Sequence, residues 1–134
     1  MKIKSIVYYR AFDFANELIK TIEGFYIQPS YFKLKNQIIR SSTSVSANII
    51  EAQNARSRLE FISFNQIALR EAEETFHWLK VIEELDINQG FDLSSLKKEN
   101  YEIIKMISAL VSSAKNNLKL EHKKQKLSST ANKK

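Results

Sequence analysis

The sequence is poor in residues that break helices or form covalent cross-links. Its 134 residues include two glycines, one proline and no cysteine. Without cysteine, the chain has no disulfide framework, no thiolate metal site and no cysteine nucleophile. The scarcity of glycine and proline argues against a sheet with many turns and favours long helices.

Long hydrophobic runs are also missing. No apolar run approaches the roughly 18 residues of a membrane-spanning helix, and the first residues lack the pattern of a secretory signal peptide. We therefore expect a cytoplasmic protein that does not enter a membrane. Hydrophobic residues make up 43% of the chain and charged residues 27%, which is ordinary for a soluble domain.

Positive charge is concentrated at the end of the chain. The net charge is +6, and residues 115–134 account for all of it with seven lysines and one glutamate. Residues 1–114 carry equal numbers of basic and acidic side chains. The high isoelectric point is therefore a property of the C-terminal segment and not of the body.

The hydrophobic periodicity predicts four helices, at about residues 5–23, 31–54, 58–86 and 95–120. The middle of the second, SSTSVSAN, is rich in small hydroxyl residues, which permit another helix to approach closely. Long helices with short connections predict an all-α, antiparallel up-and-down four-helix bundle over residues 1–120. Residues 121–134 are predicted to be a basic, disordered tail.

The third predicted helix carries more apolar surface than one stripe. A single stripe is enough to pack inside a bundle, so part of this helix is predicted to contact another subunit. The residues predicted for that interface are Phe64, Ile67, Trp78 and Val81.

A polar stripe follows one side of the second predicted helix. It consists of Gln37, Arg40, Ser44, Asn48 and Glu51, spaced by three or four residues. One interpretation is a buried hydrogen-bond ladder that fixes helix register or subunit contacts. The other is a ligand or phosphate site centred on Arg40. Arg40 and Glu51 lie about three turns apart, which favours pairing across helices over convergence on a ligand.

The polar stripe belongs to a longer pattern. Together with Glu60-Phe61, Ile67-Ala68-Leu69, Glu74 and Trp78-Leu79, it resembles the signature of the bacterial four helix bundle protein family, over about residues 6–118. Members include proteins encoded by intervening sequences in large-subunit ribosomal RNA genes. The accessory variability proteins of diversity-generating retroelements are relatives. The chain departs from the family pattern at Ala52, where glycine is usual, and at Arg70-Glu71, where the family usually has Gly-Ser.

The resemblance implies a homopentameric ring of four-helix protomers. In the retroelement relatives, such a ring binds nucleic acid and a reverse transcriptase. For this chain, the resemblance favours an oligomeric binding protein, either a nucleic-acid-associated adaptor or a purely structural homo-oligomer with a protein partner.

Basic residues are the candidates for contacting RNA or DNA. Lysine tails bind phosphates through counterion release, and several copies on a ring would add avidity. The alternative is a solubilising terminus. Further basic residues are predicted to form a rim, together with Arg40, around the end of the second helix. The candidates are Lys33, Lys35, Arg56, Arg58, Lys115, Lys119, Lys123, Lys124 and Lys126.

Two patterns on the third predicted helix resemble catalytic motifs. Arg70 and His77 share a helix face and resemble the ribonuclease motif of HEPN domains, but Glu73 and Glu74 would repel an RNA backbone. Glu74 and His77 have the Glu-x-x-His spacing of di-iron bundles, yet the second copy that such a site needs is missing. A ribonuclease using Arg70 and His77 is the weaker alternative. We predict a protein that is not an enzyme and needs no metal or cofactor.

Overall fold

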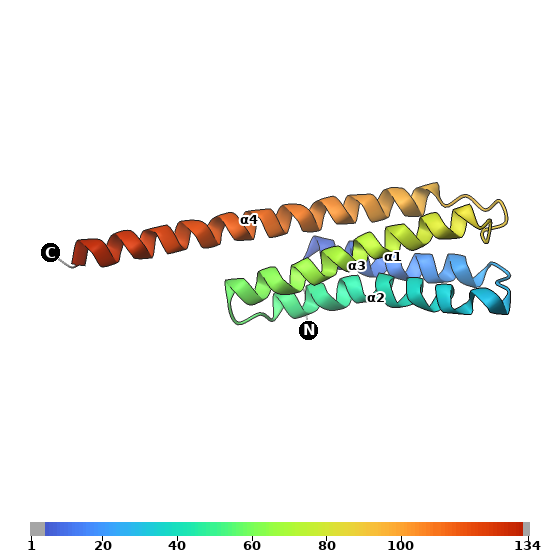
Figure 1. Ribbon diagram of the computed structural model, residues 1–134, viewed down its shortest axis with the longest axis horizontal. Coiled ribbons are helices and arrows are strands. Elements are labelled where there is room, and N and C mark those ends of the chain that lie inside the picture. Colours follow the sequence, from blue (N-terminus) through green and yellow to red (C-terminus); the bar gives the residue numbers. More distant parts are fainter. Residues whose placement is uncertain (1–4, 133–134) are drawn as a thin grey trace.

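The computed structural model describes residues 5–132, and the regular secondary structure in that range is helical. The helices are α1 (Ile6–Glu23), α2 (Phe32–Gln53), α3 (Arg58–Glu84) and α4 (Ser94–Asn132), with a short 3₁₀ turn, η1, at Pro29–Tyr31. Successive helices run in opposite directions (Figure 1). The predicted all-α four-helix bundle is confirmed.

Helix starts follow local capping chemistry. The Ser5 hydroxyl accepts a hydrogen bond from the Tyr8 amide at 3.1 Å, and the Ser57 hydroxyl accepts one from the Glu60 amide at 3.1 Å. These side chains satisfy amides that have no partner inside their helix. The chain thereby begins α1 and α3 close to the predicted positions.

Each helix packs against two neighbours. The α2–α3 pair is the most extensive, followed by α3–α4 and α1–α2, and the α1–α4 contact closes the bundle. Within residues 5–132, the diagonal pairs make no close backbone contact. The core between the helices is mainly aliphatic, and Leu18, Ile38, Leu79 and Ile107 are among its fully buried side chains.

Small side chains bring α2 and α3 together. Ser41 of α2 is buried, and α3 contributes the buried residues Ala68, Ala72 and Thr75. The hydroxyls of Ser41 and Thr75 are hydrogen-bonded at 2.8 Å, and neither residue is exposed to solvent. The close approach predicted from the small hydroxyl residues is confirmed.

Helix α4 projects well beyond the bundle (Figure 1). Its last buried residue is Ala114, and Leu118 is half-buried, whereas residues 119–131 are exposed. We call residues 115–132 the basic arm. Although α4 has 39 residues, neither it nor another helix within residues 5–132 has a stretch apolar enough to cross a membrane.

The predicted disordered tail is wrong over residues 121–132. The sequence predicted a helix ending near residue 120, but α4 continues through Asn132. The segment contains no glycine or proline to stop it, and leucine, lysine, glutamate and glutamine are strong helix formers. Low apolar content therefore marked the end of the bundle and not the end of the helix. Residues 133–134 of the predicted tail lie outside the described residues.

The bundle core and the arm differ in how they should respond to truncation of a leucine. Leu18→Ala removes a side chain with 0% exposure, so we expect it to lower the free energy of unfolding by about 2–5 kcal/mol. Leu127→Ala makes the same chemical change at a site with 64% exposure, and we expect a change within about 0.5 kcal/mol. Urea denaturation of both variants measures the difference. Equal losses of unfolding free energy in the two variants would contradict the division of the chain into a packed bundle and an exposed arm.

Candidate interaction surfaces

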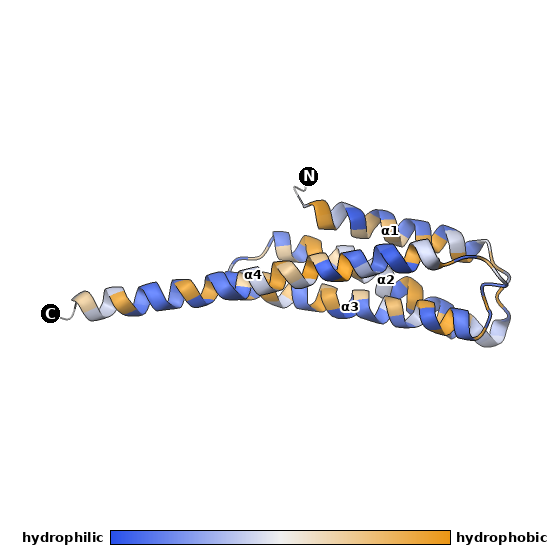
Figure 2. Ribbon diagram, turned by 90° about the horizontal axis from the view of Figure 1, so that it is seen from above, coloured by the Kyte–Doolittle hydropathy of each residue, from blue (hydrophilic) through white to orange (hydrophobic). Residues whose placement is uncertain are grey.

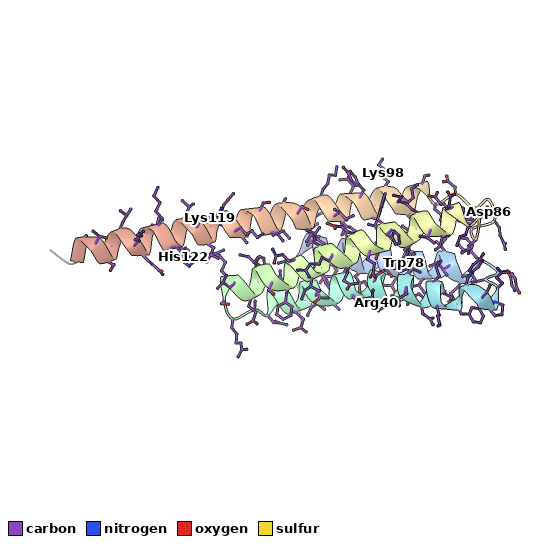
Figure 3. All side chains as sticks on the ribbon, in the orientation of Figure 1. Arg40, Trp78, Asp86, Lys98, Lys119 and His122 are labelled. Atoms are coloured by element: carbon purple, nitrogen blue, oxygen red, sulfur yellow. The ribbon has the colours of Figure 1, made fainter. Side chains whose placement is uncertain are left out.

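Arg40 joins α2 to α3 on the surface of the bundle (Figure 3). Its Nη1 donates to Glu71 Oε2 at 3.0 Å, its Nη2 contacts the Glu74 carboxylate, and its Nε donates to Gln37 Oε1 at 3.1 Å. Partial desolvation lowers the pKa of Arg40, but the hydrogen bonds and charges of Glu74 and Glu71 outweigh it and leave that pKa above its usual value. The predicted pairing of the stripe across helices is confirmed for Arg40.

The rest of the polar stripe follows α2 itself. The Ser44 hydroxyl donates to the Arg40 carbonyl at 2.7 Å, and Asn48 Nδ2 donates to the Ser44 carbonyl at 2.8 Å. Gln37, Arg40 and Glu51 are exposed on the single chain, so the stripe is not a ladder buried within the bundle. Helix α2 turns its buried serines toward the core, which leaves the adjoining polar stripe at the surface beside α3.

The two departures from the family pattern occupy different environments. Ala52 is buried at 2% exposure and belongs to the apolar side of α2. Arg70 is exposed, whereas Glu71 is half-buried and binds Arg40. The link between α2 and α3 thus uses a residue that differs from the usual family pattern.

The four predicted interface residues lie along one side of α3, on which Glu71 and Glu74 also lie. All four are half-buried, and their three- and four-residue spacing places them above and below the Arg40 contact. The apolar and polar patterns therefore meet on one surface, which we call the α2–α3 face. It comprises Gln37, Arg40, Ser44 and Asn48 of α2 and Phe64, Ile67, Glu71, Glu74, Trp78 and Val81 of α3.

The sequence pattern did not indicate an aromatic patch on α1. The Tyr8 ring lies 5.1 Å from the Tyr9 ring and 5.9 Å from the Phe12 ring, measured between centroids. Tyr9 and Phe12 are about half exposed. The signal was present as aromatic residues one and four positions apart, but an isolated aromatic stripe on a helix usually denotes core. Beside the patch, a groove of about 300 Å³ separates α1 from α2, with Thr43, Ser46, Ala47 and Ile50 on the α2 side.

A larger groove lies where α4 leaves the bundle. It encloses about 540 Å³ and is mainly apolar. Its location follows from the packing order, because α1 and α4 are the least extensively packed neighbours. No titratable side chain lines it, so it offers a surface for apolar contact. The lining residues are Ser5, Ile6, Val7, Gln53, Phe61, Met106, Ala109 and Leu110.

The basic candidates in the body fall into two groups, and the predicted single rim around the end of the second helix is wrong. Lys33 and Lys35 lie at the start of α2, where Lys35 Nζ pairs with Glu23 at 3.2 Å. Arg56 and Arg58 lie beyond the other end of the 22-residue α2, about 33 Å away. The length of one helix separates the two groups.

Arg58 belongs with the basic arm. Its Nη2 and Nε donate to Glu121 Oε1 at 2.7 and 3.1 Å. This hydrogen bonding from Arg58 is the main reason that the pKa of Glu121 is lowered. Glu121 is the one acid in residues 115–132. The five arm lysines, Lys115, Lys119, Lys123, Lys124 and Lys126, are all exposed.

Arg70 and His77 lie exposed on α3. The His77 ring contacts the edge of the Trp78 ring, with centroids 5.0 Å apart, and Glu74 is bound to Arg40. Across residues 5–132, no group of three or more histidine, aspartate or glutamate side chains is arranged to hold a metal ion. Arg70 and His77 therefore share α3 with the aromatic ring of Trp78 and the carboxylate of Glu74.

The fold and these surfaces define a small four-helix bundle protein whose fourth helix projects as a basic arm. The chain belongs to the 23S rRNA-intervening sequence protein family, whose model matches residues 4–109. The family resemblance carried by the polar stripe is thereby confirmed. The matched region ends before the basic arm.

A solved structure supports the same assignment. The chain is similar to a protein of unknown function from the S23 ribosomal protein family of Bacteroides thetaiotaomicron VPI-5482, with 31% identity and a TM-score of 0.73. The similarity covers 80% of this chain and 96% of that one. No curated protein matches the chain.

The Arg40 contact can be tested by removing the arginine. Arg40→Ala leaves the half-buried Glu71 and Glu74 side by side without their counter-charge, so we expect a loss of about 1 kcal/mol in the free energy of unfolding. Arg56→Ala is the matched control, because its side chain is 91% exposed and lies 4.0 Å from Glu60. Thermal denaturation at low salt compares the two. A melting temperature for Arg40→Ala equal to that of Arg56→Ala would show that the contact contributes nothing.

Proposed function

We propose that this protein is a non-catalytic, self-assembling binding protein that associates with nucleic acid through its basic arm. The observation that carries the proposal is uncompensated positive charge on a projecting helix. Five exposed lysines stand against one glutamate in residues 115–132, and that glutamate is already paired with Arg58. Phosphates are the natural counter-ions for such a segment.

The charge balance of the body strengthens this argument. Because residues 1–114 carry no net charge, the arm dominates the attraction of the protein for polyanions. Arg56 and Arg58 lie at the same end of the bundle and extend the basic region. The family description refers to intervening sequences in 23S rRNA, which supports an adaptor of the intervening-sequence or retroelement accessory type, with RNA as a natural ligand.

The α2–α3 face is the proposed contact between copies of the chain. It combines four half-buried apolar side chains of α3 with hydrogen-bonding groups of α2, the mixture typical of protein interfaces. The family resemblance favours a homopentamer. Several arms on one particle would bind a long polyanion more tightly than one arm does.

A purely structural homo-oligomer with a protein partner is the second candidate. The apolar groove of about 540 Å³ where α4 leaves the bundle and the exposed aromatic patch on α1 favour it, because apolar hollows and patches are typical of protein contacts. A reverse transcriptase is one class of partner that the resemblance suggests.

Neutralising the arm tests nucleic-acid binding. Substituting glutamine for all five arm lysines should abolish retention of RNA and DNA at low salt, because the phosphate contacts are lost. The matched control makes the same charge change in the body, at Lys20, Lys80, Lys97, Lys98 and Lys105, and should retain most binding. Gel shifts across a salt series measure both. Equal losses of binding in the two variants would show that binding depends on the net charge of the protein and not on the arm.

The α2–α3 face can be tested with a charged residue at its centre. Ile67→Asp places a carboxylate in the proposed interface, where desolvating it is costly, so we expect the particle to dissociate. Tyr101→Asp, at an exposed position of α4, is the control and should leave the assembly intact. Light scattering gives the mass of each particle. A wild-type mass of one protomer would refute self-assembly, and an unchanged Ile67→Asp particle would refute this interface.

A further inference from the structure

Four of the five arm lysines form one row along α4. Their spacing of four, four and three residues places them on the same side of the helix. With a rise of 1.5 Å per residue, the row is about 16 Å long. The row consists of Lys115, Lys119, Lys123 and Lys126.

The row points away from the bundle. Glu121 faces α3, because it accepts hydrogen bonds from Arg58 at the first residue of that helix. Lys119 and Lys123 are each two residues from Glu121, about 200° around the helix, so they lie on nearly the opposite side. Figure 3 shows Lys119 on the part of α4 that projects beyond the bundle. The whole row is therefore accessible to a large ligand.

Lys124 lies on another side of the arm. It shares that side with Leu120 and Leu127, which are 56% and 64% exposed. The hydropathy colouring in Figure 2 shows separate apolar bands along a mostly hydrophilic arm. Two adjacent lysines, Lys123 and Lys124, thus stand in different environments although their charge is the same.

The arm has little with which to stack on bases, because its one aromatic side chain is the imidazole of His122. Residues 115–132 contain no phenylalanine, tyrosine, tryptophan or arginine. Proteins that bind single strands without sequence preference use stacking on aromatic side chains, worth about 1–3 kcal/mol per base. The cationic groups of the arm are mainly lysine ammonium groups, which contact phosphates and do not read base edges.

We propose that the arm binds the phosphate backbone of a nucleic-acid double helix through the lysine row, without reading its sequence; this rests on the proposed function above. A row of about 16 Å matches about half a turn of a B-form duplex. A duplex offers one charge per 1.7 Å or so of axis, and its stiffness keeps phosphates aligned with a straight helix. A flexible single strand offers fewer charges and loses conformational freedom on binding.

The first experiment compares ligands for the full-length wild-type chain. An RNA duplex, a DNA duplex of equal length and their separate strands are titrated by fluorescence anisotropy across salt concentrations. We expect both duplexes to bind more tightly than the strands. Because each neutralised phosphate contributes about −0.9, four contacts per arm give a slope of log K against log salt near −4. Comparing the affinities for the RNA and DNA duplexes shows which of the two backbones the arm binds more tightly.

The second experiment separates the row from net charge. Lys119→Gln and Lys124→Gln remove the same charge, but only Lys119 lies in the row. We expect Lys119→Gln to reduce the magnitude of the salt slope by about one per arm, and Lys124→Gln to leave it unchanged. Lys123→Gln provides a second row variant next to the control position. Circular dichroism confirms that the variants keep equal helicity.

The outcomes separate this inference from the proposed function. If the wild-type chain retains no nucleic acid at low salt, both fail. If single strands bind as tightly as duplexes, or if Lys119→Gln and Lys124→Gln weaken binding equally, nucleic-acid binding stands and the duplex-specific row is refuted. Loss of duplex binding in the double variant Leu120→Ser, Leu127→Ser, with helicity retained, would also refute it, because the apolar side would then be the contact surface.

Discussion

The close contact between α2 and α3 is the constraint on which the rest of the molecule depends. Its centre is the fully buried hydrogen bond between Ser41 and Thr75. Hydroxyl groups can be buried there because each finds a partner, whereas an unpaired one would cost about 1–3 kcal/mol. With the two helices locked side by side, Arg40 reaches Glu71 and Glu74, and the chain reverses at the end of the bundle where Arg58 meets the arm.

The molecule is divided into an electrically balanced body and a basic arm. The family match covers residues 4–109 and therefore the body, while the arm follows it as an uninterrupted continuation of α4. The body thus carries the packing surfaces of the chain, and the arm carries its net charge. This division is why assembly through the body and binding through the arm can be proposed as separate properties, each resting on its own residues.

Local patterns predicted the bundle well. Apolar periodicity placed the helix bounds, except the end of α4, within a few residues of their observed positions, and the serines of α2 indicated a close helix contact. The same patterns were wrong about the tail, because loss of apolar residues removes the reason to pack without removing helix propensity. They were also wrong about a single basic rim, because Lys33 and Arg58 are separated by the full length of α2. The local pattern did not predict the aromatic patch at Tyr9, because the exposure of that patch depends on which helices lie beside α1.

The sequence by itself determined the number of helices, their approximate limits except at the end of α4, the family and the location of the net charge, because all of these depend on residues close together in the chain. Only the tertiary structure decided which sides of those helices remain exposed. It brought Arg40 to glutamates 31 and 34 residues away, placed the polar stripe at the surface, and left the arm without a neighbour beyond Arg58. The physical reason is that exposure and long-range pairing depend on relative helix lengths and packing order, which no local pattern records.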